Sequence, residues 1–414
     1  MQRTDVAVIG AGQAGLAVSR CLSERGIGHV VLERGRVAER WRSERWDSLR
    51  LLTPNWMTRL PGGGYRGPDP DGFMTMPETV RFFEEYGRSI GAPVESGAEV
   101  RSAEAIDGGF RLFTNRARWT ARAIVVATGY SDRPCVPPIA RHISPSIRQI
   151  TPWDYRNPGQ LPPGGVLVVG ASATGMQLAE EIHRSGRPVT LSVGGHTRLP
   201  RLYRGQDILW WLDRLGTLDR PIGELPDPAA ARRQSSLQLI GTPERRSLDL
   251  AHLCDQDVRL VGRAVAAYDR RVRFDGNLGA ATAAAEYRLR RVLANIDRAA
   301  ALHGDGRSDE PQSVQALILN VDPVEIDLID QGIRTVIWAT GYHREYPWLK
   351  MPVFDAQGEI LNDGGICPLP GLYVLGLNFM RRRNSSFIDG VGRDAEALAD
   401  HIAGFVGALP RIAA

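Results

Sequence analysis

The chain has 414 residues, of which 43% are hydrophobic, and this is enough for a sizeable core and for two domains. No apolar run reaches the roughly 18 residues that cross a bilayer, and an apolar strand is expected close to the N-terminus. We therefore expect no membrane span, no signal peptide and a cytoplasmic location. The net charge of +4 comes without a nucleic-acid-binding motif, so we expect anionic small molecules rather than nucleic acids as partners.

The four cysteines, Cys21, Cys135, Cys254 and Cys367, are scattered along the chain. They form no Cys-x-x-Cys pair and no spacing suited to zinc, so we expect no metal site. Most disulfide reductases pass electrons through two neighbouring cysteines, which this sequence does not supply locally. Four buried, inert thiols are the expectation.

The first motif is a strand, a glycine-rich turn and a helix. Asp5–Ile9 is short, apolar and rich in β-branched residues, which predicts a strand buried on both faces. Gly10 permits the tight turn, Gly12 lets backbone N–H groups approach a pyrophosphate, and Gly15 lets the helix pack on the strand. The phosphates would bind at the N-terminus of that helix, which is expected to run to about Arg25.

A second strand, His29–Leu32, ends at Glu33, an acid placed to bind ribose hydroxyls. The Trp41–Trp56 segment that follows is too rich in tryptophan and arginine for an ordinary surface loop. Its aromatic groups suit a flavin ring, with Arg42, Arg45 and Arg50 near phosphates. The alternative is that the tryptophans anchor a long loop to the core.

Further elements end this first unit. A helix is expected over Pro77–Ser89, and short strands near residues 99–100, 110–113 and 117–121. An apolar strand, Ala123–Ala127, runs into Thr128-Gly129-Tyr130, which is typical of a sheet end that lies close to a cofactor. Proline is dense from Pro134 to Pro163, where we expect a domain boundary.

The opening pattern then recurs as Val166–Val169, Gly170-Ala171-Ser172-Ala173-Thr174-Gly175, a helix to about His183 and the strand Val189–Val193. Ser172 replaces the middle glycine and adds a hydroxyl beside the expected phosphates. The spacing that leads from Gly10 to Glu33 leads here to Val193, where no acid stands to repel a 2′-phosphate. Arg198 is close by, with Arg201 and Arg204 as further candidates, so NADPH is favoured over NADH. The alternative for these arginines is a solvated loop.

The rest of the chain adds an insertion and returns to the first unit. Residues 207–233 form the expected insertion, residues 258–265 and 271–274 an antiparallel pair, 280–302 a helix and 304–312 a loop. The strand Thr335–Ala339 and Thr340-Gly341-Tyr342 repeat the earlier strand-Ala-Thr-Gly-Tyr ending. Residues 372–375 are a further strand, and the tail 385–395 opens the last helix. For Arg381-Arg382-Arg383 we expect an exposed basic loop, with contact to phosphates or substrate as the alternative.

Together, the two glycine motifs, the Leu51-Leu52-Thr53-Pro54-Asn55 segment, the two Ala-Thr-Gly-Tyr strand ends and the tail resemble the flavin-containing monooxygenases, the class B flavoproteins. The resemblance covers nearly the whole chain. It implies an α/β fold with two Rossmann-like domains. A discontinuous FAD domain, residues 1–160 and 330–414, would hold an inserted NADPH domain, residues 161–329. It also implies a small-molecule substrate, O2 and a possible homodimer.

The resemblance further implies site residues and a mechanism. NADPH would reduce FAD, O2 would give a C4a-hydroperoxyflavin, and one oxygen atom would pass to a soft nucleophile, N or S. Asn55 is the catalytic candidate. The candidates for cofactor binding are Gly10, Gly12, Gly15, Glu33, Arg34, Trp41, Arg42, Trp46, Thr53, Val100, Thr128, Gly129, Gly170, Ser172, Thr174, Gly175, Arg198, Arg204, Thr340, Gly341, Ser386 and Asp389.

One departure separates this chain from the family pattern. The family fingerprint FxGxxxHxxx followed by an aromatic residue would fall near Ile143–Tyr155, where Thr151-Pro152 replaces the histidine and only Tyr155 survives. This indicates a divergent bacterial subgroup and argues against Baeyer–Villiger oxygenation of a ketone. The sequence is also compatible with an NADPH oxidase or flavin reductase that releases H2O2, and with a redox-sensing flavoprotein without enzymatic activity.

Overall fold

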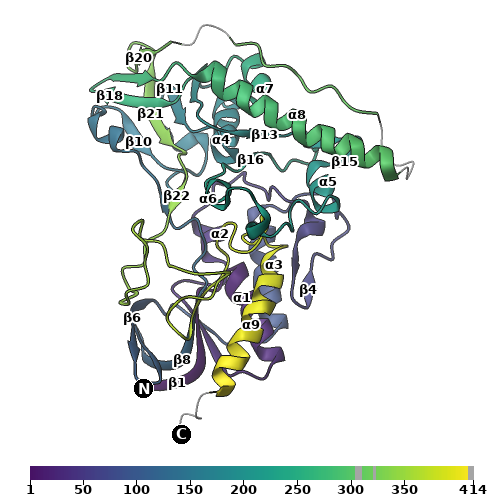
Figure 1. The fold of residues 1–414 in the computed structure, drawn as a ribbon. Coiled ribbons are helices and arrows are strands. Elements are labelled where there is room, and N and C mark those ends of the chain that lie inside the picture. Colours follow the sequence, from purple (N-terminus) through teal and green to yellow (C-terminus); the bar gives the residue numbers. More distant parts are fainter. Residues whose placement is uncertain (304–309, 320–322, 409–414) are drawn as a thin grey trace.

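The computed structural model describes residues 1–303, 310–319 and 323–408, so most of the predicted 304–312 loop lies outside the described residues. Two sheets with flanking helices form two lobes, drawn one above the other in Figure 1. This mixed α/β fold with two Rossmann-type units confirms the predicted fold class. Within the described residues, no helix is long and apolar enough to span a membrane.

The sheet of the first lobe has the strand order β5-β2-β1-β8-β7-β6, with β23 also paired to β8. β1, β2, β8 and β23 run parallel, and the apolar half of β1 is fully buried between its neighbours. Its strands are β1 (Gln2–Ile9), β2 (His29–Glu33), β5 (Val94–Ser96), β6 (Val100–Ile106), β7 (Gly109–Thr114), β8 (Arg118–Val126) and β23 (Leu372–Val374). β23 comes from the end of the chain, so this lobe is discontinuous.

The two strands expected near residues 117–121 and 123–127 are one continuous strand, β8. Arg122 lies in its middle but does not interrupt it, because its guanidinium donates to the carbonyl of Val406 and pairs with Asp5 at 3.2 Å. A charged side chain whose hydrogen bonds and charge are satisfied is compatible with a buried strand.

The sheet of the second lobe is parallel and has the order β10-β21-β11-β12-β17. Its strands are β10 (Arg148–Ile150), β11 (Gly165–Val169), β12 (Val189–Ser192), β17 (Arg259–Val261) and β21 (Ile333–Trp338). β10 and β21 lie outside residues 161–329. The second sheet therefore takes one strand from each side of the segment predicted for the NADPH domain.

The predicted single strand over residues 258–265 is wrong, because the chain turns at Gly262–Arg263. β17 joins the parallel sheet beside β12, whereas β18 (Ala264–Tyr268) pairs antiparallel with β19 (Arg271–Phe274). β20 (Glu325–Asp327) completes this small sheet. This turn places residue 263 at the carboxyl edge of the second sheet.

Two short strands connect the lobes. β9 (Arg133–Pro134) carries the chain into the second lobe and β22 (Tyr342–His343) carries it back. They pair antiparallel, and β22 lies between the lobes in Figure 1.

The helices cover the sheets and the insertion. α1 packs against α9 in the first lobe. α3 begins one residue before the predicted Pro77, because Thr75 caps it in a capping box with Glu78. The helices are α1 (Gln13–Glu24), α2 (Glu39–Ser43), α3 (Met76–Ser89), α4 (Ala173–Arg184), α5 (Ile208–Arg214), α6 (Pro228–Arg232), α7 (Leu250–Asp255), α8 (Leu278–His303) and α9 (Val391–Ala408).

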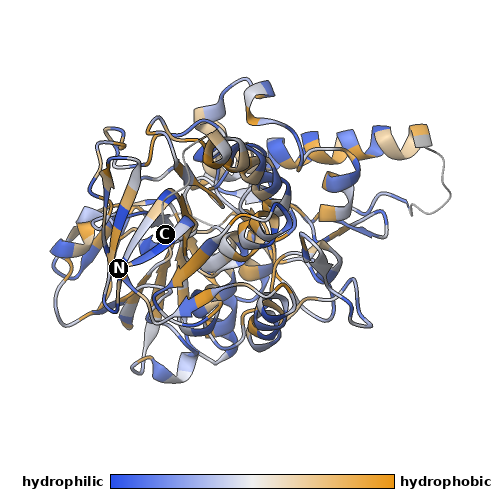
Figure 2. Cartoon of the chain, turned by 90° about the horizontal axis from the view of Figure 1, so that it is seen from below, coloured by the Kyte–Doolittle hydropathy of each residue, from blue (hydrophilic) through white to orange (hydrophobic). Residues whose placement is uncertain are grey.

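The long helix α8 confirms the helix predicted over residues 280–302. Leu289 and Ile296 are buried against Leu209 and Trp211 of α5, so this helix holds the insertion in place. Its C-terminal part projects beyond the rest of the molecule in Figure 2, where polar and apolar residues alternate along it.

Candidate cofactor and substrate site

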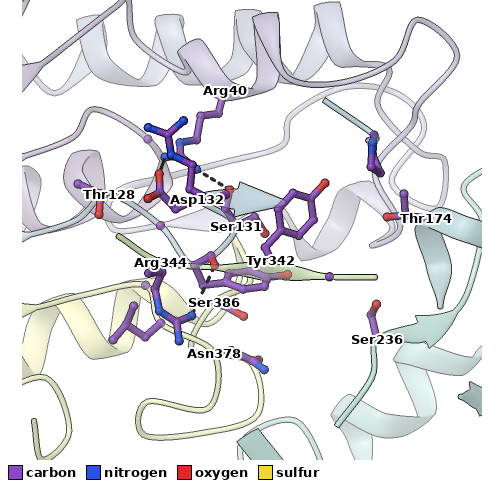
Figure 3. Close-up of a pocket in the computed structure, with 18 of the residues that line it drawn as sticks. Arg40, Thr128, Ser131, Asp132, Thr174, Ser236, Tyr342, Arg344, Asn378 and Ser386 are labelled. Atoms are coloured by element: carbon purple, nitrogen blue, oxygen red, sulfur yellow. Dashed lines mark hydrogen bonds and ion pairs between the residues drawn. The ribbon is translucent and has the colours of Figure 1, made fainter. Parts of the chain in front are cut away.

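A cavity of about 1550 Å³ lies between the two lobes. Both glycine turns and both Ala-Thr-Gly strand ends line it. Figure 3 shows Tyr342 between Thr128 of the first lobe and Thr174 and Ser236 of the second. The carboxyl ends of both parallel sheets therefore face one shared space, which is where α/β sheets bind ligands.

The first glycine turn has the geometry that a dinucleotide requires. Gly10 has φ +106°, and a Cβ there would lie 2.7 Å from the carbonyl oxygen of Ala127. A Cβ on Gly15 would lie 1.8 Å from the carbonyl oxygen of Gly10, so only glycine lets the helix cross the strand here. Gly12 has open space beside it, and no side chain caps the N-terminus of α1. This leaves room and backbone donors for a pyrophosphate.

Glu33 lies at the end of β2 and lines the cavity. Its carboxylate accepts hydrogen bonds from the backbone N–H of Ala11 at 2.7 Å and of Gly35 at 2.8 Å. The side chain thus fastens the glycine turn to β2. Each carboxylate oxygen still has a lone pair for a ribose hydroxyl.

The second glycine turn repeats the first. Gly170 has φ +110°, a Cβ on Gly170 would lie 2.3 Å from the carbonyl oxygen of Ala339, and one on Gly175 would lie 1.7 Å from that of Gly170. Ser172 is the N-cap residue of α4, but its side chain makes no capping hydrogen bond. The turn therefore fits a second dinucleotide, with the Ser172 hydroxyl available to it.

The two turns differ where the second strand of each unit ends. After β12 the cavity wall is formed by Gly194, Gly195 and Arg263. None of these residues is acidic. The position of a Cβ on Gly194 is 3.1 Å from Nε of Arg263, so the guanidinium lies directly over this turn. Arg263 is exposed and makes no ion pair with a described carboxylate. The end of β12 therefore carries a cation where the end of β2 carries the acid Glu33.

Comparisons with known proteins agree with this geometry. A sequence model of the pyridine nucleotide-disulphide oxidoreductases matches residues 7–204. An uncharacterized CzcO-like oxidoreductase of Geobacillus kaustophilus is 31% identical over 401 residues, which cover 96% of this chain and 98% of that protein. The chain belongs to the CzcO-like oxidoreductases. This family implies FAD and a pyridine nucleotide as cofactors, and the two glycine turns fit both.

Two further proteins are similar. The indole-3-pyruvate monooxygenase YUCCA1 of Oryza sativa subsp. japonica is 31% identical over 193 residues, 45% of this chain and 47% of that protein. The solved structure of a flavin-containing monooxygenase from Stenotrophomonas maltophilia superposes with a TM-score of 0.68 at 17% identity, covering 98% of this chain and 99% of that one. This oxidoreductase therefore has the fold of the family that its sequence resembles.

Most of the residues predicted to bind cofactor line the cavity. They are Gly10, Gly12, Glu33, Arg34, Trp41, Trp46, Thr53, Val100, Thr128, Gly129, Gly170, Ser172, Thr174, Thr340, Gly341 and Ser386. Trp46 is also buried in the core and Trp41 stacks on Phe83 at 6.2 Å, so the tryptophans anchor the loop while facing the cavity. Gly15 and Gly175 lie behind the turns.

Asn55, the catalytic candidate, does not line the cavity, and its catalytic role stays a prediction. It is 4% exposed; its Nδ2 donates to the carbonyl of Asp69 at 2.9 Å and its Oδ1 accepts from the backbone N–H of Met74 at 2.9 Å. In this structure Asn55 braces the loop that carries Leu52 and Thr53 to the cavity wall. Its position indicates a structural role rather than contact with a cofactor.

Arg198 and Arg204 require a correction, since neither lines the cavity. Arg198 is buried and pairs with Asp249 at 2.8 Å and Glu286 at 3.0 Å. Arg204 pairs with Asp297 at 2.7 Å. Their charges are paired within the second lobe, away from the cavity wall.

Arg42 and Asp389 lie outside the cavity wall as well. Arg42 pairs with Glu84 at 2.6 Å, and Asp389 pairs with Arg59. Arg201 is fully buried; it donates to the carbonyl of Leu52 at 2.8 Å and pairs with Asp207 at 2.6 Å. Arg201 therefore ties the second lobe to the cavity loop of the first.

Arg263 is the residue that the sequence did not reveal. The carboxyl ends of neighbouring parallel strands meet at one edge, so a residue just after the strand beside β12 lies near the ribose position. That signal was hidden because residues 258–265 were expected to form one antiparallel strand.

All four cysteines lie in the described part of the chain, and none lines the cavity. Burial raises the pKa of the Cys21 and Cys367 thiols to about 12, so both stay protonated and unreactive at neutral pH. Cys135 is exposed and Cys254 half-buried, which corrects the expectation of four buried thiols. Among the residues that the structure describes, no three His, Cys, Asp or Glu side chains form a possible metal site.

Proposed function

We propose that this oxidoreductase is a FAD-dependent monooxygenase that consumes NADPH and transfers one oxygen atom from O2 to a nitrogen or sulfur atom of a small organic substrate. The observation that carries the proposal is the shared cavity, into which both glycine turns open. A hydride donor held at one turn and a flavin held at the other would meet inside it. The monooxygenase names of the Stenotrophomonas structure and of the rice relative support this proposal.

The cysteine arrangement supports oxygen rather than a disulfide as the electron acceptor. A disulfide reductase of the common type carries two neighbouring cysteines beside the flavin, and here none of the four cysteines reaches the cavity wall. Electrons that leave the flavin would therefore pass to O2 or to another small acceptor in the cavity.

Bound FAD would accept a hydride and activate O2, and this chemistry belongs to the cofactor. The residues of this chain would hold the two cofactors and shield the reacting atoms from water. The turn at Gly10–Gly15 and Glu33 would hold FAD, and the turn at Gly170–Gly175 would hold the nicotinamide dinucleotide. Trp41, Trp46 and Leu51 give the wall of the first lobe an apolar surface that keeps water away from the reacting atoms.

The preference for NADPH over NADH rests on charge at the end of β12. Arg263 lies over Gly194, where we expect the adenosine 2′-group to bind, and the Val193–Arg198 segment contains no carboxylate that would repel a phosphate. An Arg–phosphate contact is charge-assisted and is roughly twice as strong as a neutral hydrogen bond.

The test measures how much NADPH is consumed and how much oxygen enters the product. The purified holoenzyme is reduced anaerobically with NADPH and with NADH, and then turns over in oxygen-18 with a panel of amines, thioethers and ketones. We expect faster reduction by NADPH and one labelled oxygen atom in an N- or S-oxide for each NADPH consumed. Stoichiometric H2O2 without labelled product would indicate an oxidase, and a flavin that NADPH does not reduce would indicate a redox-sensing protein.

A further inference from the structure

The Arg381-Arg382-Arg383 run, expected to be an exposed basic loop, splits into three different environments. Arg381 donates to the carbonyl of Gly364 at 2.7 Å, and Arg382 pairs with the buried Asp394 at 2.9 Å. Both serve the packing of the tail. Arg383 alone lines the cavity.

Arg383 lacks an anionic partner among the residues that the structure describes. Its Nη1 donates to the amide oxygen of Gln234 at 2.9 Å, and its guanidinium lies 5.5 Å from the ring centre of Phe379. Over residues 1–303, 310–319 and 323–408, no carboxylate forms an ion pair with it. Burial lowers the pKa of this guanidinium below its ordinary value, because its charge has lost water and gained no counter-charge.

The wall around Arg383 is built where the insertion of the second lobe meets the tail of the first. The backbone N–H of Ile222 donates to the carbonyl of Arg381 at 2.8 Å, and that of Asn384 donates to the carbonyl of Leu218 at 3.2 Å. Asn378 and Ser386, which flank Arg383 in sequence, lie together below Tyr342 in Figure 3. Neither glycine turn contributes to these contacts.

Apolar side chains complete this wall. Leu209 and Leu239 belong to one hydrophobic cluster, against which Phe387 packs, and all three line the cavity. Phe379 and Met380 line it as well. The cation therefore stands at the margin of an apolar surface, an arrangement that suits a molecule with an apolar body and one negative charge.

We infer that Arg383 binds the anionic group of the substrate, and that the substrates are small organic anions in which an apolar body carries the oxidisable atom. The word substrate rests on the oxygenase activity proposed above. In the proposed function the nucleotide phosphates would bind at the N-termini of α1 and α4 and the 2′-phosphate at Arg263, which leaves Arg383 for a different anion. A partly buried cation without an anionic partner gains most from an anion with a planar, bidentate carboxylate.

The experiment compares one acid with its neutral amide. (Phenylthio)acetate and (phenylthio)acetamide share the ring and the sulfur atom, and a neutral amide in the second replaces the carboxylate of the first. Binding of each to the oxidised FAD-loaded enzyme is measured by calorimetry without turnover. We expect the wild type to bind the acid at least about tenfold more tightly than the amide, and R383M to lose that preference while keeping its affinity for the amide.

Two further variants keep the test specific. R383K retains a positive charge but loses the bidentate guanidinium, so it should keep part of the preference for the acid over the amide. R263M should weaken NADPH binding and leave the acid preference unchanged. Flavin content and melting temperature check that each variant is folded.

Equal binding of acid and amide by the wild type would overturn the inference. So would an R383M variant that binds NADPH more weakly while keeping its preference for the acid, because Arg383 would then serve the nucleotide. If the acid preference depends on Arg383 but no oxygen-18 enters any product, the anion site stands and the oxygenase proposal fails.

Discussion

The two glycine turns have nearly the same backbone conformation but different side chains around them. Gly10 and Gly170 have φ +106° and +110°, and in each unit a Cβ on the third glycine would overlap the carbonyl of the first. The units differ at the middle glycine, which is Ser172 in the second, and where their second strands end, at Glu33 in one and at Gly194 beside Arg263 in the other. The pyrophosphate cradle is thus a property of the backbone, whereas the choice of nucleotide depends on one or two side chains.

The largest expected effect comes from filling either cradle. Gly15→Ala and Gly175→Ala place a methyl group 1.8 Å and 1.7 Å from a backbone carbonyl oxygen, so the backbone itself must move. The cost should be at the upper end of the roughly 1–3 kcal/mol known for overpacking, or more. Gly15→Ala should yield protein depleted of FAD. Gly175→Ala should keep FAD and raise the KM for NADPH about tenfold or more.

Flavin absorbance per chain and steady-state kinetics measure the two outcomes. Gly404→Ala in α9 is the matched control, because a Cβ there meets nothing within 4 Å and the position is exposed. It should stabilise the protein by up to about 1 kcal/mol. If Gly175→Ala lost FAD as readily as Gly15→Ala, the assignment of one cofactor to each turn would be wrong.

The next largest effect distinguishes a structural role of Asn55 from a catalytic role. Asn55→Ala removes the acceptor for the buried N–H of Met74 and should cost about 1–3 kcal/mol of stability. Asn55→Asp keeps an acceptor for that N–H but buries a carboxyl group opposite the carbonyl oxygen of Asp69, so it should lower the melting temperature at least as much as Asn55→Ala does. Unchanged stability in Asn55→Ala, together with a loss of coupling between NADPH use and oxygenation, would restore the catalytic role.

A smaller effect should follow at the end of β12. Arg263→Met removes the cation over Gly194 and should lower kcat/KM for NADPH about tenfold while leaving that for NADH unchanged. The wild-type preference for NADPH should also weaken at high salt, because this arginine is exposed. Arg204→Met is the control, since Arg204 pairs with Asp297 away from the cavity. An equal loss with both nucleotides in Arg263→Met would contradict a 2′-phosphate contact.

The sequence predicted the parts of this site that depend on the backbone. A glycine that must have positive φ or must lie under a crossing helix leaves a periodic signal, so both turns and both Ala-Thr-Gly strand ends were found on the cavity wall. The strand β2 and the helix of residues 280–302 also followed from a continuous apolar run and a helix-forming run, whereas the bounds of β8, β17 and β18 did not.

Side-chain partners could not be predicted in the same way. The sequence suggests that Arg198 is free to bind a phosphate, but the fold places Asp249 and Glu286 beside it. It also suggests that Arg263 belongs to a strand, but β17 ends two residues earlier. The three adjacent arginines at 381–383 differ only in which distant residues face them. Such pairings depend on contacts between remote segments, and local sequence carries no record of them.

The smallest expected effect concerns one histidine in each unit, His29, which is partly buried, and His196, which is buried. Burial lowers the pKa of His29, at the start of β2, and of His196, which follows β12. A lowered pKa means that the folded state binds fewer protons than the unfolded chain as pH falls through the ordinary histidine value of about 6.5. The stability contribution is therefore present above that pH and is lost below it.

Replacing either histidine with glutamine should reduce the fall in melting temperature between about pH 7.5 and about pH 5.5. His29 and His196 differ in one respect. Burial is the cause that lowers the pKa of His29, whereas Arg288 and Arg198 add to burial at His196. Added salt partly screens those two cations. It should therefore reduce the part of the acid-induced fall in melting temperature that is due to His196, and leave the part due to His29 unchanged. A salt effect of the same size in both variants would show that the arginines next to His196 do not set its proton affinity, and that the two units titrate alike.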